Sequence, residues 1–285
     1  MLAGGAAVSC LAAEPAGWAV GPQYDSTHVY VAPDQVAGFV QSFIATFGGD
    51  ASQAGGGHRH ADAEHDHIAG GVRARRLPVG VWLQDADPLW FGEERTGYLV
   101  TDLDAAVAAA RRAGAQVVVA PFPDAIGRDA VIRWPGGVQM QLYWHTKPPS
   151  YAPLATTPEN RVYLSPDSAD AFVRAFSAFA GARVTADDAD APGEEIGRPG
   201  ERYRRIRLTS GFGRMTVLVT DGHLPWPYGR EISGYETADL AGALARAKAA
   251  GALVVAGPYS AGDRDAAMLQ FPGGYIAEVH AARRP

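Results

Sequence analysis

The stretch His28–Gly48 reads HVYVAPDQVAGFVQSFIATFG, and the stretch Arg161–Gly181 reads RVYLSPDSADAFVRAFSAFAG. Aligned without a gap, the two stretches are identical at nine of 21 positions. Further along, Thr96–Phe122 matches Ser233–Tyr259, also without a gap and at a slightly larger offset. Repeated blocks in the same order are typical of an internal duplication. The chain is therefore predicted to contain two similar domains.

A third repeated block sets the ends of the two domains. WPGGVQMQ (Trp134–Gln141) matches FPGGYIAE (Phe271–Glu278) at the same offset as the second block. We expect domain 1 over residues 23–148 and domain 2 over residues 158–282, joined by a Pro-rich linker over residues 149–157. Within each domain, a strand-like run, a helical pattern and further strand-like runs follow one another twice. Asp102, for example, is expected to cap a helix that begins at Leu103. Each domain is thus predicted to be α+β, with two βαβββ units.

The composition is that of a folded protein. The 285 residues are 47% hydrophobic and 20% charged, with a formal net charge of −6. These values exclude a disordered chain and offer no basic surface for nucleic acid. The single Cys10 excludes an intrachain disulfide and a thiolate zinc site. No apolar run reaches the roughly 18 residues of a membrane-spanning helix, and the sequence contains no nucleophile-elbow, Walker or dinucleotide-binding motif.

Residues 1–22 are predicted to lie outside both domains. Leu2–Ala13 (LAGGAAVSCLAA) has the length and the small residues of a signal-peptide core, but no Lys or Arg precedes it. Two interpretations stay open. The segment is either an Ala/Gly-rich tail on a cytoplasmic protein or the remnant of an export signal.

The opening HVYV, the segment VTDLDAAVAAARRAGA (Val100–Ala115) and the two PGG-containing ends resemble the vicinal oxygen chelate superfamily. This superfamily includes glyoxalase I, bleomycin-resistance proteins and extradiol dioxygenases. The resemblance covers nearly the whole chain after residue 23. It implies two tandem α+β domains, in each of which paired βαβββ units curl into a cup. It also implies a divalent metal in the cup, held by His or Glu from the first strand, the last strand and the strand that opens the second unit. The fold alone does not select a function.

In domain 1 the resemblance places His28 at the first-strand position, Gln141 at the last-strand position and Arg95 near the opening of the second unit. One imidazole, one amide and an arginine are a weak ligand set, because a catalytic divalent site needs about three fixed ligands. Strand alternation adds three residues to the lining of this cup, namely Tyr30, Gln139 and Tyr143. We expect a polar, almost uncharged pocket for a neutral or polar organic ligand. His28 is a candidate acid or base there, and a polar lining without catalysis is the alternative.

In domain 2 the resemblance places Arg161 at the first-strand position, Ile232 near the opening of the second unit and Glu278 at the last-strand position. Arg161 and Glu278 would then face each other, and the guanidinium would take the charge role of the metal. Strand alternation adds Tyr163 and His280 to the lining of this cup. On this interpretation domain 2 is mainly structural.

Two charged segments are interpreted as solvated loops. His58–His67 (HRHADAEHDH) holds half of the eight histidines and is flanked by glycines. Such a segment has either incidental metal affinity or a role in metal capture. Ala186–Glu195 (ADDADAPGEE) lacks the regular ligand spacing of a calcium loop, so it is expected to be an acidic loop in solvent.

Two functions of different classes follow. In the first, the protein has degenerate metal sites, needs no cofactor and binds a small organic molecule in the domain 1 cup. The second is a metal-dependent glyoxalase- or dioxygenase-like enzyme, a lyase, isomerase or oxygenase, in which His28 with Gln141 or Glu278 holds Zn, Ni, Fe or Mn. Bringing His28 and Glu278 together requires units to exchange partners between domains or between the chains of a homodimer. The expected partner is a small-molecule ligand, and neither nucleic acid nor a membrane span is expected.

Overall fold

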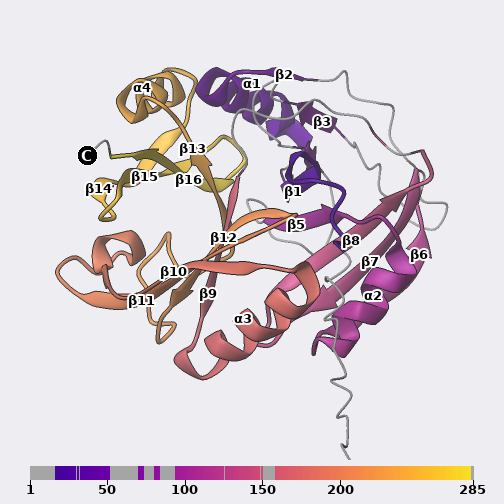
Figure 1. The fold of residues 1–285 in the computed structure, drawn as a ribbon. Coiled ribbons are helices and arrows are strands. Elements are labelled where there is room, and N and C mark those ends of the chain that lie inside the picture. Colours follow the sequence, from indigo (N-terminus) through magenta and orange to yellow (C-terminus); the bar gives the residue numbers. More distant parts are fainter. Residues whose placement is uncertain are drawn as a thin grey trace, which may run out of the picture.

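The computed structural model describes residues 17–29, 31, 33–51, 70–73, 80–83, 94–124, 126–147, 149 and 158–283. Its elements confirm the predicted repetition: strand, helix and three strands occur four times in succession (Figure 1). The first unit consists of β1 (Asp25–Val29), α1 (Val36–Phe47), β2 (Asp50–Ala51), β3 (Gly70–Arg73) and β4 (Gly80–Leu83). The second consists of β5 (Glu94–Leu99), α2 (Leu103–Arg112), β6 (Gln116–Pro123), β7 (Gly127–Arg133) and β8 (Gln139–His145).

Domain 2 repeats this pattern, with longer strands in its first unit. Its first unit consists of β9 (Glu159–Leu164), α3 (Pro166–Ala180), β10 (Arg183–Pro192), β11 (Arg202–Ser210) and β12 (Gly213–Val219). Its second consists of β13 (Ile232–Glu236), α4 (Leu240–Ala249), β14 (Leu253–Ser260), β15 (Arg264–Gln270) and β16 (Ile276–Ala282). The described residues also form three short 3-10 helices, η1 (Pro22–Tyr24), η2 (Pro33–Gln35) and η3 (Gly193–Ile196). No helix among the described residues is long and apolar enough to cross a membrane.

Each domain builds one eight-stranded sheet from its two consecutive units. The strand order is β2-β3-β4-β1-β5-β8-β7-β6 in domain 1 and β10-β11-β12-β9-β13-β16-β15-β14 in domain 2. The opening strands of the two units are antiparallel neighbours in the middle of each sheet. Both sheets curl into half-barrels. Among the described residues, no sheet combines units of different domains. A shared sheet is the arrangement that the enzyme hypothesis needs within one chain to bring His28 and Glu278 together.

The helices begin where the sequence predicts a cap. Asp102 precedes α2, and its carboxylate accepts a hydrogen bond from the Ala105 amide at 3.0 Å. The equivalent Asp239 caps α4 by accepting from the Gly242 amide at 2.9 Å. Each carboxylate satisfies one of the amides that a helix leaves unpaired in its first turn.

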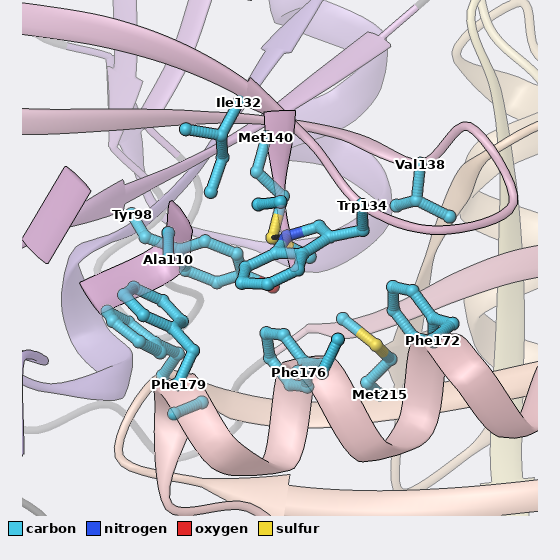
Figure 2. Close-up of a cluster of buried hydrophobic side chains, with 14 of the residues drawn as sticks. Tyr98, Ala110, Ile132, Trp134, Val138, Met140, Phe172, Phe176, Phe179 and Met215 are labelled. Atoms are coloured by element: carbon cyan, nitrogen blue, oxygen red, sulfur yellow. Dashed lines mark hydrogen bonds between the residues drawn. The ribbon is translucent and has the colours of Figure 1, made fainter. Parts of the chain in front are cut away.

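The apolar faces of the helices join the two domains. α1 lies against α4, and α2 lies against α3 (Figure 1). One buried cluster connects the second unit of domain 1 with the first unit of domain 2. In it Trp134, 2% exposed, packs edge-on against Phe176 and tilted against Phe179 of α3 (Figure 2). A second cluster connects the first and fourth units through α1 and α4.

Two equivalent pairs of polar side chains lie between the central strands of the two sheets. The Thr27 and Ser233 hydroxyls lie 3.1 Å apart, and the Thr96 hydroxyl lies 3.4 Å from Asn160 Oδ1 and 3.1 Å from Glu231 Oε1. Thr27 and Asn160 directly precede the two stretches of the first repeated block, and Thr96 and Ser233 open those of the second. The contact is therefore made twice, related by the internal repeat, and it adds a polar centre to the two apolar interfaces.

Candidate functional site

The strand register puts equivalent residues at the centre of both cups. In domain 1, His28 of β1 is opposite Arg95 of β5, and Gly97 of β5 is beside Gln141 of β8. In domain 2, Arg161 of β9 is opposite Ile232 of β13, and Gly234 is beside Glu278 of β16. The residues assigned from the superfamily resemblance thus occupy neighbouring strands in each sheet.

The cup of domain 2, called cup two below, is occupied by the Arg161 guanidinium. Arg161 is 0% exposed, and its Nη1 lies 3.1 Å from Glu159 Oε1 and 3.6 Å from Glu278 Oε1. Its Nη2 lies 2.9 Å from Glu195 Oε1. Gly234 makes room for this arrangement, because a Cβ there would lie 2.7 Å from Glu278 Oε2 and 3.1 Å from Arg161 Cδ.

Two further arginines balance the charge of the buried carboxylates. Arg264 donates to both oxygens of Glu159 at 3.0 to 3.2 Å, and Arg205 donates to Glu195 Oε2 at 2.6 Å. The Tyr203 hydroxyl also donates to Glu195 Oε2, at 2.5 Å. Three carboxylates thus face three guanidiniums in one buried network. A buried charge is tolerated only when it is paired and hydrogen-bonded in this way.

The network keeps Glu159 and Glu278 ionised. Burial alone would raise the pKa of Glu159, but Arg264 and Arg161 hold it well below its usual range. In the same way His280 and Arg161 lower the pKa of Glu278 against the effect of burial. His280 Nδ1 lies 2.6 Å from Glu278 Oε2. At the edge of the cup, burial raises the pKa of Tyr228 to about 12, so its hydroxyl stays protonated at neutral pH.

Cup two does not fit the divalent metal that the fold family implies. Of its three candidate positions one carries the Arg161 guanidinium, one the apolar Ile232 and one the Glu278 carboxylate. The guanidinium has five N–H donors and no acceptor, so it cannot ligate a cation. No group of three or more His, Cys, Asp or Glu residues suited to a metal ion occurs in the part of the chain that the structure describes.

The cup of domain 1, called cup one below, contains a carboxylate that pairs with the Gln141 amide. Gln141 is 9% exposed, and its Nε2 donates to Asp129 Oδ2 of β7 at 2.9 Å. Burial and the nearby Asp124 carboxylate raise the pKa of Asp129 to about 7, against the opposing effect of the Gln141 hydrogen bond. Asp129 therefore exchanges a proton near neutral pH.

An apolar wall continues from this pair toward the edge of the sheet. In the register of the strands, Phe122 is opposite Asp129, and Val119 is opposite Val131, which in turn is opposite Gln141. Directly opposed residues of antiparallel strands share one face of the sheet. Phe122 is 36% and Val119 is 41% exposed. This face of domain 1 thus combines a hydrogen-bonding pair with apolar side chains that remain accessible.

The equivalent wall of cup two is covered. In the alignment of the second repeated block, Val119 and Phe122 correspond to Ala256 and Tyr259. Both are partly buried and pack against a cluster of Ile232, Met268 and Ile276. The two cups therefore differ in accessibility as well as in charge.

The other predicted residues of cup one are placed in part. Tyr143 is 8% exposed, and its hydroxyl donates to the Tyr24 carbonyl oxygen, while Gln139 is exposed at the start of β8. Tyr30 lies outside the described residues, as do the side chains of His28 and Arg95 and the His-rich segment 58–67. The opposite face of β8 carries Met140 and Leu142, both buried under the helices. In cup two, Tyr163 is partly buried next to Arg161, and His280 is 2% exposed.

Two expectations from the sequence are wrong. The segment Ala186–Glu195 is not a loop: it forms most of β10 and of η3, and although Asp187 and Asp190 are exposed as expected, Glu195 is 0% exposed. The cations that compensate Glu195 come from β9 and β11, so nothing next to it in the sequence indicates its burial. The second wrong expectation is that cup one is almost uncharged, because the Asp129 carboxyl group lies in it. The alternation of side chains along β8 predicts only which residues of β8 line the cup. Asp129 belongs to β7, and the sequence does not give the register of β7 with β8.

Comparisons with known proteins find similarity in structure only. No family model matches the chain, and no curated protein sequence matches it. Among solved structures, 2,2',3-trihydroxybiphenyl 1,2-dioxygenase from Sphingomonas wittichii RW1 superposes with a TM-score of 0.58 at 15% identity, over 94% of this chain and 91% of the other. The 2,3-dioxygenase LapB from Pseudomonas sp. KL28 gives a TM-score of 0.60 at 12% identity, over 94% of each chain.

A third similar structure is not a dioxygenase. The Mn(II)-bound glyoxalase from Novosphingobium aromaticivorans superposes with a TM-score of 0.55 at 18% identity, over 93% of this chain and 83% of the other. Because proteins of different activity are about equally similar, these comparisons establish the architecture and leave the activity open. Together with the four βαβββ units and the two cups, they show that the chain has the tandem-domain fold of the vicinal oxygen chelate superfamily.

Proposed function

We propose that the protein binds a small organic molecule in cup one and that cup two is a structural ionic core. The observation that carries the proposal is the difference between equivalent walls: Val119 and Phe122 are exposed, whereas Ala256 and Tyr259 are packed. Ligand pockets are typically apolar with a few polar groups that fix orientation. Cup one has that character, with Asp129 and Gln141 as the polar groups.

A binding titration with Nile red, a neutral apolar dye, tests this function. Val119→Trp places an indole on the wall of cup one, and we expect it to weaken dye binding at least tenfold. Val184→Trp is the matched control, because Val184 is 48% exposed on the outer strand β10 and is opposite Leu208, which packs toward the helices. Saturable binding that both variants weaken equally, or that neither weakens, contradicts the proposal.

We further propose that Arg161 takes the charge role of a metal in cup two, and that the protein holds no divalent metal there. The three carboxylate contacts of Arg161 support this role. Arg161→His replaces the cation by a ligand within reach of Glu278, and we expect one additional Co²⁺ per chain relative to the unmodified protein, detected by absorption spectroscopy. The comparison with the unmodified protein accounts for Co²⁺ bound by the segment 58–67. An additional site that persists in Arg161→His/Glu278→Gln would refute the assignment.

A further inference from the structure

The polar groups beside the apolar wall of cup one, Asp129 and Gln141, indicate which class of ligand it binds. Gln141 Nε2 donates to Asp129 Oδ2, which fixes the orientation of both side chains. An ionised carboxylate has only acceptors, and the amide oxygen Oε1 of Gln141 is likewise an acceptor. The polar pair therefore presents acceptor atoms, and it is complementary to a ligand that donates hydrogen bonds.

The described charges of the β6–β7 hairpin point in the same direction. Asp124 stands at the end of the β6–β7 hairpin and is close enough to Asp129 to repel it electrostatically. Its Oδ1 accepts hydrogen bonds from the Ile126 and Gly127 amides, so this carboxylate is held in place by the turn. Arg128, on the same hairpin, is bound to Asp104 of α2 through two hydrogen bonds of 2.7 and 3.0 Å. The hairpin thus brings two carboxylates toward one end of the cup, while Arg128 pairs with Asp104 and Arg133 pairs with Gln116 of β6.

The positions equivalent to Asp129 and Gln141 carry different residues in cup two. The position of Asp129 is Ala266 there, and that of Gln141 is Glu278, which contacts Arg161. In cup two the acceptor oxygens are thus matched by a cation of the chain itself. In cup one the carboxylate comes from a different strand and stands beside an exposed phenyl ring, Phe122.

We propose that cup one selects an organic cation, specifically a primary ammonium group attached to a flat apolar body. The ammonium group donates to Asp129 and to Gln141 Oε1, and the apolar body lies against Val119 and Phe122. A charge-assisted hydrogen bond to a carboxylate is about twice as strong as a neutral one. An aromatic face also attracts a cation. This inference rests on the proposed function and adds the chemical class of the ligand.

Three probes of one shape test the class: 2-naphthylmethylamine, 2-naphthalenemethanol and 2-naphthoate, titrated into the full chain by calorimetry at pH 8. We expect the amine to bind at least tenfold more tightly than the alcohol and the carboxylate to bind most weakly. Asp129→Asn should abolish the preference for the amine and leave binding of the alcohol within about twofold. Asp170→Asn, which removes an exposed carboxylate of α3 in domain 2, is the control and should leave the preference intact.

The outcomes separate this inference from the proposed function. Equal binding of the three probes, each weakened by Val119→Trp, would retain a ligand site in cup one and overturn its cation selectivity. A preference for the amine that survives Asp129→Asn would also overturn it. Nile red binding without binding of any naphthyl probe would reject the ligand class alone. Failure of the dye and of all three probes would reject the proposed function with it.

Discussion

Replacement of Arg161 by Met is the sharpest test of the buried network. Met keeps most of the side-chain length and removes the charge, so the change leaves carboxylates short of a partner without opening a large cavity. Glu159 keeps Arg264 and Glu195 keeps Arg205, whereas Glu278 keeps only His280 among the described contacts of the network. Glu278 is therefore the group left without a permanent cation.

The expected loss follows from the burial of the pair. Both side chains are at most 1% exposed, and removing one partner of such a pair typically costs about 3–5 kcal/mol. At roughly 2 °C per kcal/mol for a chain of this size, the melting temperature should fall by about 6–10 °C. Urea denaturation followed by far-ultraviolet circular dichroism measures the free energy directly.

A control and a double variant make this prediction refutable. Arg128→Met breaks an exposed pair, with Arg128 38% and Asp104 65% exposed, and should cost less than about 1 kcal/mol. Arg161→Met/Glu278→Gln restores the balance of two carboxylates and two guanidiniums, and should recover at least half of the loss. The reasoning is wrong if Arg161→Met destabilises the protein no more than Arg128→Met. It is also wrong if the loss of stability in the double variant equals the sum of the losses in Arg161→Met and Glu278→Gln.

Three further predictions concern stability. Asp102→Ala removes the cap of α2 and should lower the free energy of unfolding by about 1 kcal/mol in urea denaturation, whereas Asp104→Ala, which breaks only the exposed pair with Arg128, should lower it by less. Trp134→Ala should cost about 3–5 kcal/mol, because it empties the centre of the cluster in Figure 2; a loss below about 1 kcal/mol would show that the core is loosely packed. Glu159 has a native pKa below its unfolded value near 4.5, so its contribution is complete above that pH and is lost as the pH falls further. Denaturation at pH 6, 4 and 3 should therefore show a steep loss for the unmodified protein and a shallower one for Glu159→Gln, and equal slopes would contradict the assignment.

The sequence by itself determined the repeat and the local structure. Three blocks at nearly constant offsets are enough to predict two domains and four βαβββ units, because the pattern of apolar residues and caps is a local property. Asp102 is an example of such a local interaction. Its carboxylate binds the amide of Ala105, three residues further along the chain, and this contact needs no distant partner. The burial of Met140 and Leu142 follows in the same way from alternation along one strand.

Only the tertiary structure decided which strands are neighbours and which charges are compensated. Glu195 looks like part of a solvated acidic run until β9 and β11 bring Arg161 and Arg205 to it. Asp129 enters cup one only through the register of β7 with β8. The energy of a buried charge depends on partners that are far away in sequence, and the register of a sheet is set by packing across it. For this reason the fold can be predicted from the repeats in the sequence. The difference in charge and accessibility between the two cups depends on which strands pair, so it requires the tertiary structure.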